Sequence, residues 1–203
     1  VPSSALCIPL GGRTQSPFSI RRLAAYIQEN FGIPFLDHDY PVGWLGTKAW
    51  IRHLGEFLGR QHQALLVEKE QEKRLKLPVT QCRANMQKMR AVLCIGRPLI
   101  HFQPDWVIEL IGLAGIRLEA IVLFSGLTQE QRNVMRQQLK KYTSSPIFEE
   151  EEGEALIQTA DLLITTHELE NETKRQLFLP VLPPLGVGGM VRLVNQLARL
   201  ARQ

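Results

Sequence analysis

The sequence predicts an α/β protein built on a Rossmann-like parallel sheet, and two observations in its second half support that prediction. Short, largely apolar segments such as residues 91–95 and 118–124 recur at regular intervals, and segments with helical periodicity separate them. Strands that are apolar along their whole length are typical of parallel sheets with helices on both faces. The 203 residues, 44% of them hydrophobic, are enough for one large domain, or for one full domain and part of another.

The first ninety residues predict a short α/β segment followed by a long polar helix. Ser16 and Pro17 are typical of a helix start, and Gly32 is typical of a helix end. Thr47 is expected to cap the second helix, and Pro78 to interrupt the polar one. In chain order we expect a strand at 4–10, a helix at 17–30, an extended segment at 33–36, a helix from 47 to about 58 and a helical segment at 61–90.

From residue 91 onward, strands and helices are expected to alternate up to the last helix. That helix is amphipathic, with Val187, Met190 and Leu197 on its inward face. The acidic run at 149–152 is expected to be a solvated loop and a first helical turn, where carboxylates favour the helix dipole. We expect strands at 91–95, 118–124, 146–148, 161–165 and 180–182, and helices at 104–114, 128–142, 154–159, 169–177 and 186–202.

These elements divide the chain into three parts. Residues 1–60 are interpreted as the C-terminal remnant of a Rossmann-like α/β domain, and residues 61–90 as a connecting helical segment. Residues 91–203 are interpreted as a complete Rossmann-like domain with a closing helix. The chain opens at Val1 inside an apolar strand, without the features of a signal peptide. We therefore expect it to be the C-terminal portion of a longer protein.

Composition and charge narrow the range of functions. The net charge is +4, but basic and acidic residues are mixed and no basic stripe carries interleaved aromatics, so nucleic-acid binding is not expected. No apolar run approaches the roughly 20 residues of a bilayer crossing, so no membrane association is expected. Cys7, Cys82 and Cys94 have no paired spacing, which favours a reducing, cytoplasmic compartment over a disulfide framework.

The loops that follow the strands are the candidate ligand site, because ligands of parallel sheets bind at the carboxyl ends of the strands. Arg97, after Gly96, is suited to hold an anionic group, although an exposed arginine paired with a carboxylate explains it equally well. His167, between Thr166 and Glu168, is interpreted as a ligand, a proton donor or a surface residue.

Two further features have a simple structural interpretation beside a functional one. The glycines at 186, 188 and 189 open a helix after a strand, but Val191 replaces the third glycine of a dinucleotide-binding loop, so a tight turn is favoured. Cys7 is placed where a thiolate faces a cleft, yet a lone cysteine more often packs as a small apolar side chain. No catalytic triad or carboxylate pair is identifiable.

Several segments, in this order along the chain, resemble the nitrogenase component 1 family. That family includes the molybdenum–iron protein subunits, the cofactor-assembly scaffold subunits and the subunits of dark-operative protochlorophyllide reductase. The similar segments are the helix end at 24–34, the Pro41-Val42-Gly43 loop with Thr47, the charged helix at 66–74, the strands at 91–96 and 160–164, and the closing stretch from Leu179 to Gly189.

The resemblance implies a subunit of three Rossmann-like domains that hold a metallocluster or a tetrapyrrole between them. This chain would correspond to the end of the second domain and the whole third domain. The family's cofactor-lining positions fall on Cys7, Gly96, Arg97, Thr166, His167 and Glu168, and Cys7 falls where some members have a cluster-ligating cysteine. The ligating histidine of the catalytic subunit has no counterpart at 182–186, which favours a scaffold-like or divergent member.

Three hypotheses about function follow. The first is a nitrogenase component 1-like oxidoreductase subunit that acts with a homologous second subunit and an ATP-dependent iron-protein reductase. In this hypothesis the isolated chain is inactive, because it carries too few ligands for an iron–sulfur cluster or metallocluster. The second is a scaffold or binding subunit that holds the same cofactor without turnover. The third is an unrelated nucleotide- or sugar-binding α/β module.

Overall fold

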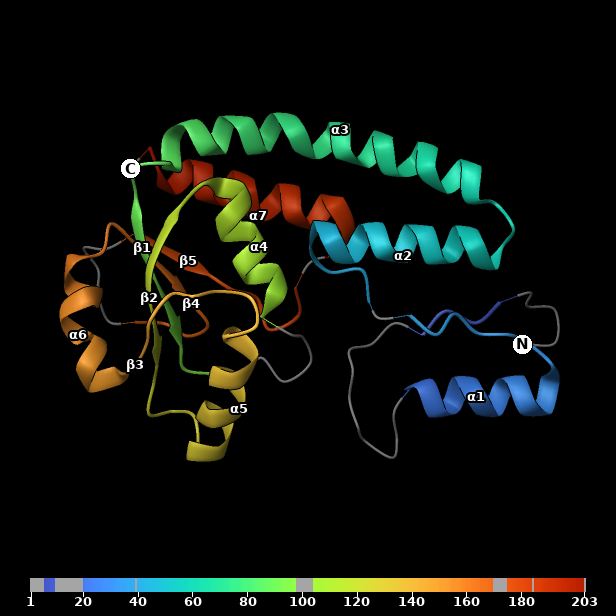
Figure 1. Ribbon diagram of the computed structural model, residues 1–203, viewed down its shortest axis with the longest axis horizontal. Helices are drawn as coiled ribbons and strands as arrows, with labels where there is room; N and C mark the ends of the chain where they lie inside the picture. Colours follow the sequence, from blue (N-terminus) through green and yellow to red (C-terminus); the bar gives the residue numbers. More distant parts are fainter. Residues whose placement is uncertain are drawn as a thin grey trace.

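The computed structural model of the chain describes residues 6–9, 20–38, 40–97, 104–169, 175–183 and 185–202. Its centre is a five-stranded sheet in the order β3-β2-β1-β4-β5, with every neighbouring pair parallel (Figure 1). The predicted α/β fold with a parallel sheet is therefore confirmed. The strands are β1 (Arg90–Ile95), β2 (Arg117–Leu123), β3 (Ile147–Glu149), β4 (Leu162–Thr165) and β5 (Arg175–Phe178).

Side chains of β1 alternate between two core clusters, one on each face of the sheet. Leu93 and Ile95 belong to the larger cluster, while Val92 and Cys94 belong to the smaller one. All four are completely buried, as expected for the central strand of a parallel sheet. The helices are α1 (Ile20–Phe31), α2 (Gly43–Phe57), α3 (Gln61–Met86), α4 (Asp105–Ala114), α5 (Gln129–Leu139), α6 (Glu150–Thr159) and α7 (Gly186–Leu200).

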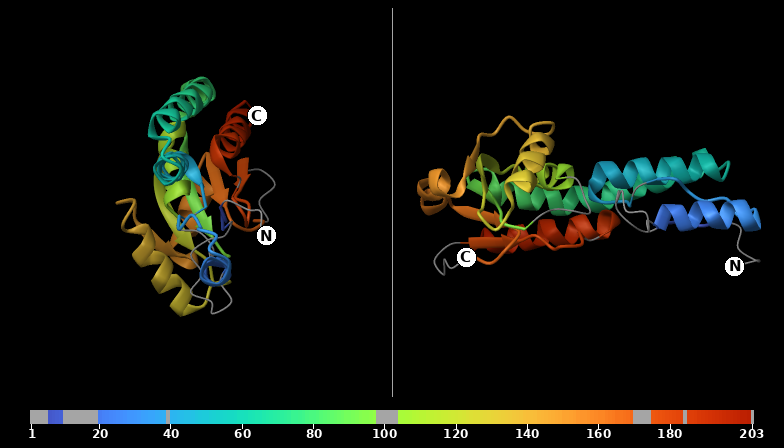
Figure 2. Two further views of the ribbon diagram at one scale, coloured as in Figure 1. Left: turned by 90° about the vertical axis from the view of Figure 1, so that its right-hand side faces the viewer. Right: turned by 90° about the horizontal axis from the view of Figure 1, so that it is seen from below.

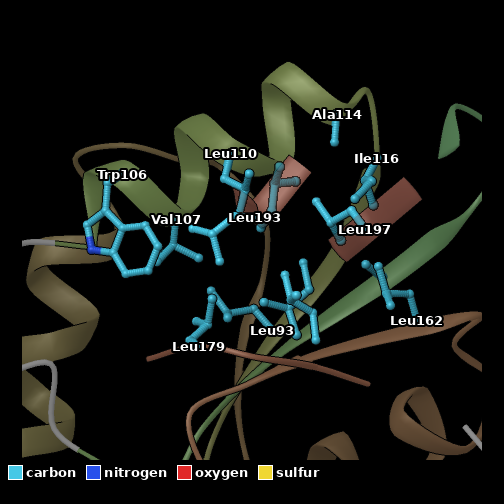
Figure 3. Packing of buried hydrophobic residues seen from close by; sticks show 14 of the residues in the cluster. Leu93, Trp106, Val107, Leu110, Ala114, Ile116, Leu162, Leu179, Leu193 and Leu197 are labelled. Carbon is cyan, nitrogen blue, oxygen red and sulfur yellow. The ribbon is translucent and has the colours of Figure 1, made fainter. Parts of the chain in front are cut away.

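The larger cluster lies between the sheet and the helices α4, α5 and α7. Figure 3 shows Val107 and Leu110 of α4 directed toward Leu93 of the sheet, with Leu193 and Leu197 of α7 beside them. The smaller cluster lies on the opposite face and is covered by α6. Gly153 lets α6 approach closely, because a Cβ atom there would collide with the side chain of Val122 in β2.

α2 and α3 form an antiparallel pair that also contributes to the larger cluster, through Trp44, Leu75, Cys82 and Met86 (Figures 1 and 2). The pair meets closely at Gly55, where a Cβ atom would collide with that of Ala64. A bidentate ion pair joins the two helices, because Nε and Nη2 of Arg52 donate to the carboxylate of Glu68 at 2.6 and 2.8 Å. The Lys48 ammonium lies 3.8 Å from the same carboxylate.

α7 closes the structure by returning to elements that precede the sheet. It packs against α2 and α3 as well as against α4 and β5. Its first residue, Gly186, donates its N–H to the carbonyl of Pro41 at 2.8 Å. The predicted amphipathic helix is present, with Val187, Met190 and Leu197 buried.

The predicted cap of α2 at Thr47 is wrong. The helix begins four residues earlier at Gly43, and the Thr47 hydroxyl donates to the Gly43 carbonyl at 2.5 Å from within the helix. The N–H groups of Trp44 and Leu45 instead donate to the carboxylate of Glu109 in α4, at 2.8 and 2.9 Å. A capping group from a distant helix leaves no local sequence pattern, which explains the error.

The predicted interruption at Pro78 is also wrong, since α3 continues for 26 residues through it. Proline removes one backbone hydrogen bond, but the buried residues Leu75 and Cys82 on either side hold the helix against the core. The acidic run forms the first turn of α6, which begins at Glu150 and not at Glu154.

The end of the sheet differs from the prediction. Residues 175–177, expected to end the helix 169–177, belong to the strand β5, and residues 180–182 lie outside any strand. Leu177 and Leu179 are both buried, so this segment follows the period of a strand, and β5 pairs along its whole length with β4. Residues 170–174 lie outside the described part of the chain.

Near the N-terminus, the predicted strands at 4–10 and 33–36 are represented by a single parallel bridge between Cys7 and Phe35. Ser16 and Pro17, the predicted start of the first helix, lie outside the described residues, and α1 is described from Ile20. Within the described ranges, no helix combines the length and apolar character that a membrane crossing requires.

Candidate functional site

The candidate site lies at the carboxyl edge of the sheet, where the neighbouring strands β1 and β4 end. From β1 the chain continues through α4 to β2, which lies on one side of β1 in the sheet. β4 lies on the other side of β1 and is followed by the edge strand β5. Such a reversal of strand order separates the loops and is where open parallel sheets bind ligands.

Thr166 joins the loops that follow β1 and β4. Its Oγ1 accepts the N–H groups of Gly96 and Arg97, at 3.0 and 3.1 Å, and its own N–H donates to the Cys94 carbonyl at 3.1 Å. Thr166 is only 4% exposed, so these bonds are shielded from water. The two loops are therefore held in one fixed arrangement.

His167 packs its ring against this junction. The ring meets Phe124 edge-on at 4.5 Å between centroids, and a Cβ atom at position 96 would collide with it and force the ring to shift. The His167 backbone is fixed by Thr165, whose hydroxyl donates to the His167 carbonyl and accepts its N–H. Nδ1 of His167 is buried and has no hydrogen-bond partner among the described residues.

Two charged groups shift the pKa of His167 in opposite directions. Burial lowers the pKa of His167 below 6.5, the positive charge of Arg97 lowers it further, and the carboxylate of Glu150 partly offsets both. Hydrogen bonds from Ser125 lower the pKa of Glu150, whose Oε2 accepts the Ser125 N–H at 2.9 Å. At neutral pH the site therefore combines a neutral imidazole with a carboxylate.

A pocket of about 830 Å³ adjoins this cluster and shares three of its residues. On its far wall Glu149 is held by Arg136 of α5 at 2.7 Å, and Nε of Arg132 lies 3.1 Å from the same carboxylate. The volume is within the range of small-molecule sites. The lining residues are Leu123, Phe124, Ser125, Gln129, Arg132, Glu149, Glu150, Glu151, Glu154 and Ile157.

The structure brings together four of the six residues that the sequence singled out. Gly96, Arg97, Thr166 and His167 form the junction of the β1 and β4 loops. Glu168 is the next residue along the chain and is exposed. Cys7 lies elsewhere, in its bridge to Phe35, and the segment that carries it lies beside α1, away from the sheet (Figures 1 and 2).

Sequence reasoning missed Phe124 and Glu150 as parts of the site. Glu150 belongs to the acidic run that was interpreted as a solvated turn, and Phe124 to the end of a core strand. One indirect signal was present: Arg132 and Arg136, four residues apart on one helix, both reach the carboxylate of Glu149, the neighbour of Glu150.

The chemistry of the donor atoms tests whether this site holds a metal. Among the described residues, no three or more His, Cys, Asp or Glu side chains gather as a metal-binding group would. Cys94 lies at the end of β1, but burial raises the pKa of its thiol to about 12, which disfavours the thiolate that metals bind. Neither Cys94 nor a cluster of acidic or histidine side chains therefore forms a recognisable metal centre among the described residues.

Comparisons with known proteins agree with the fold. The model of the family described as nitrogenase component 1 type oxidoreductase matches residues 13–201. A structure of nitrogenase Cp1 at pH 5 superposes with a TM-score of 0.62 and 11% identity, and covers 98% of this chain and 47% of its own. A second structure, nitrogenase Cp1 at pH 6.5, superposes with a TM-score of 0.60 and 12% sequence identity. The match covers 99% of this chain and 50% of the other.

At these identities the structural likeness establishes the fold alone. The chain spans about half the length of the solved relatives that it matches. A search of curated protein sequences finds no match.

Proposed function

Since the chain belongs to the nitrogenase component 1 type oxidoreductase family, we propose that it is the C-terminal part of an oxidoreductase subunit that helps enclose a metallocluster or a tetrapyrrole. In this proposal the intact subunit acts with a homologous second subunit and receives electrons from an ATP-dependent iron-protein reductase. The observation that carries it is the junction at which Thr166 fixes the loop of Gly96 and Arg97 beside the ring of His167.

Each residue of the junction has a role in the proposal. Arg97 is exposed, and no described residue forms an ion pair with it, so its guanidinium is available to an anionic group of the cofactor. The neutral imidazole of His167 can accept or donate one hydrogen bond without bringing a charge into the site. Glu168 and Cys7 stay proposed cofactor-lining residues, with Cys7 as a proposed metal ligand.

The domain boundaries also stay proposals: residues 1–60 as the remnant of a second Rossmann-like domain, 61–90 as the connecting segment and 91–203 as the third domain. The first part has one supporting feature, because Cys7 and Phe35 form a parallel bridge with α1 between them, as in a βαβ unit. Leu23, Tyr26 and Phe31 of α1 are exposed, as expected for a helix whose packing surface belongs to a larger domain.

Enclosure is the main contribution that we assign to this half of the subunit, with Cys7 as its one proposed metal ligand. When bound, a metallocluster or tetrapyrrole would supply the redox chemistry. The chain's own residues would exclude water, with Phe124 and the β1 loop as a wall, and would orient the cofactor through Arg97 and His167.

A scaffold role without turnover is the second candidate, and the scarcity of ligand groups among the described residues favours it. The nucleotide-binding alternative has less support. The N–H groups of Gly96 and Arg97, which would cradle a phosphate, already donate to Thr166, and that of Gly186 donates to Pro41.

The test is to purify the full-length protein anaerobically, alone and with its homologous partner, and to record iron content and the visible spectrum. We expect bound cofactor in the complex, and a shifted or weakened spectrum in Arg97→Ala and His167→Ala. Arg192→Ala, an exposed change on α7, is the matched control and should leave the spectrum unchanged. Colourless, iron-free protein in both preparations would contradict the proposal, and a bound cofactor without turnover would favour the scaffold role.

A further inference from the structure

A groove with an apolar floor and a basic rim lies where α2, α3 and α4 meet, and its volume is about 520 Å³. Trp44 and Leu75 close the inner end of the floor and are 8% and 4% exposed. Figure 1 shows that the three helices approach one another on the side of α3 that faces the sheet. The groove is lined by Trp44, Lys69, Glu72, Lys73, Leu75, Lys76, Val79 and Leu113.

The rim carries three lysines and one carboxylate, Glu72, all of α3, so its net charge is positive. Lys69, Lys73 and Lys76 are spaced by four and three residues, so they follow one side of α3. All three are exposed, and within the described part of the chain no carboxylate forms an ion pair with them. Lys48 nearby differs, because it lies over the Trp44 ring at 5.6 Å and close to Glu68.

We propose that this groove binds an acidic amphipathic helix of a partner protein. Apolar side chains spaced by three and four residues would cover Trp44, Val79 and Leu113, while carboxylates along the edge of the same helix would meet the three lysines. Apolar anchors in a groove provide affinity, and complementary charge provides orientation and a faster association. The inference does not depend on the proposed function.

A second copy of the chain fits this groove poorly, although it carries an acidic helix. The carboxylates of α6 are exposed at Glu151, Glu152 and Glu154, but the apolar residues Leu156 and Ile157 of that helix pack into the smaller core cluster. The outer side of α6 therefore offers charge without apolar anchors. Nucleic acid likewise offers charge alone, which leaves the apolar floor without a partner.

The test measures binding of a synthetic, fluorescently labelled helix with a leucine stripe flanked by glutamates to the full chain by anisotropy. We expect binding that the combined substitution Lys69→Glu, Lys73→Glu and Lys76→Glu weakens by about tenfold or more, in line with the loss of several interfacial charge pairs. The matched control combines Lys140→Glu, Lys141→Glu and Arg192→Glu. It changes the net charge equally at exposed positions elsewhere and should alter binding by no more than about twofold.

A second peptide with the same leucines flanked by lysines should not bind. A variant of the floor, Val79→Glu, should weaken binding of the acidic helix while far-UV circular dichroism shows an unchanged fold.

Three results would overturn the proposal. The first is a lack of specific binding: either the acidic helix does not bind, or the rim variant and its control weaken its binding equally. The second is binding of duplex DNA or phosphatidylserine vesicles that requires the same lysines and that the peptide does not displace. The third is self-association in sedimentation velocity that the rim variant abolishes, because the occupant would then be a second copy.

Discussion

At the scale of single residues, the junction of the β1 and β4 loops depends on backbone groups and small side chains more than on charges. Thr166 uses one oxygen to hold two N–H groups, and Gly96 provides the space in which the His167 ring lies. A hydroxyl that satisfies buried backbone groups is costly to remove, because the N–H groups then lose their partner away from water. The position of the His167 ring therefore depends on Thr166 and Gly96, which carry no titratable side chain.

The pKa of His167 should respond to its two charged neighbours with opposite signs. Arg97→Gln removes a positive charge that disfavours the imidazolium, so the pKa of His167 should rise toward 6.5. Glu150→Gln removes the favourable carboxylate, so the pKa should fall further below 6.5. An NMR titration of the imidazole carbon protons measures both changes. Shifts of the same sign in the two variants would show that the groups act through a change in packing and not through charge.

At the scale of elements, structure that depends on neighbouring residues in the sequence was predictable, and structure that depends on distant residues was not. Strands 91–95, 118–124 and 161–165 were predictable because each contains a run of buried residues, 91–95, 120–124 and 162–165, that is apolar except for Thr165. The Glu109 cap of α2 was not predictable, because it comes from a helix 65 residues away. β5 was missed because four residues with one buried leucine fit a helix as well as a strand until β4 is beside them.

The residues of the candidate site also divide into predictable and unpredictable ones. Gly96, Thr166 and His167 were predictable, since loops at the carboxyl ends of parallel strands come together. Glu150 and Phe124 join them only because β2 and β3 lie next to β1 in that order, which no local pattern indicates.

The packing of α6 on β2 gives a prediction about stability. Gly153→Ala would place a methyl group against Val122, so we expect the free energy of unfolding to fall by about 1–3 kcal/mol. Each kcal/mol should lower the Tm by roughly 2–4 °C. Gly188→Ala is the matched control, because it lies in α7 with open space around it and should be neutral or up to about 1 kcal/mol stabilising. Thermal unfolding followed by circular dichroism compares the two. Equal Tm values would mean that α6 moves freely on the sheet.

The ion pair between α2 and α3 gives a prediction about pH. Hydrogen bonds from Arg52 hold the pKa of Glu68 below 4.5, against the opposing effect of burial. Because the folded pKa is depressed, the stabilisation is complete above 4.5 and is lost as the pH falls through the folded value. The Tm of Glu68→Gln should therefore lie below that of the unchanged protein at pH 7, and the gap should close in acid.

Glu70→Gln is the control for that experiment, since Glu70 forms an exposed pair with Arg74 on the same helix at 3.3 Å. It should change the Tm little at either pH. A gap for Glu68→Gln that stays constant in acid would show that shape, and not charge, determines the effect.

At the scale of the whole molecule, two buried thiols report whether the two faces of the sheet unfold together. Cys82 belongs to the larger core cluster and Cys94 to the smaller, and burial raises their pKa values to about 11 and about 12. Neither should react with iodoacetamide in the folded state. In increasing urea, both should become alkylated with one midpoint, as measured by mass spectrometry of their peptides in a Cys7→Ser background. An earlier midpoint for Cys82 would mean that α3 detaches before the sheet unfolds.

The position of α7 has a consequence for how the chain is made. α2 and α3 are synthesised first, yet part of their packing surface is α7, which comes from the last residues of the described chain. A ribosome that adds about 5–20 residues per second needs on the order of ten seconds to pass from the end of α3 to the end of α7. During that interval the nascent helices expose apolar surface, so we expect the growing chain to depend on a chaperone that shields it until α7 emerges.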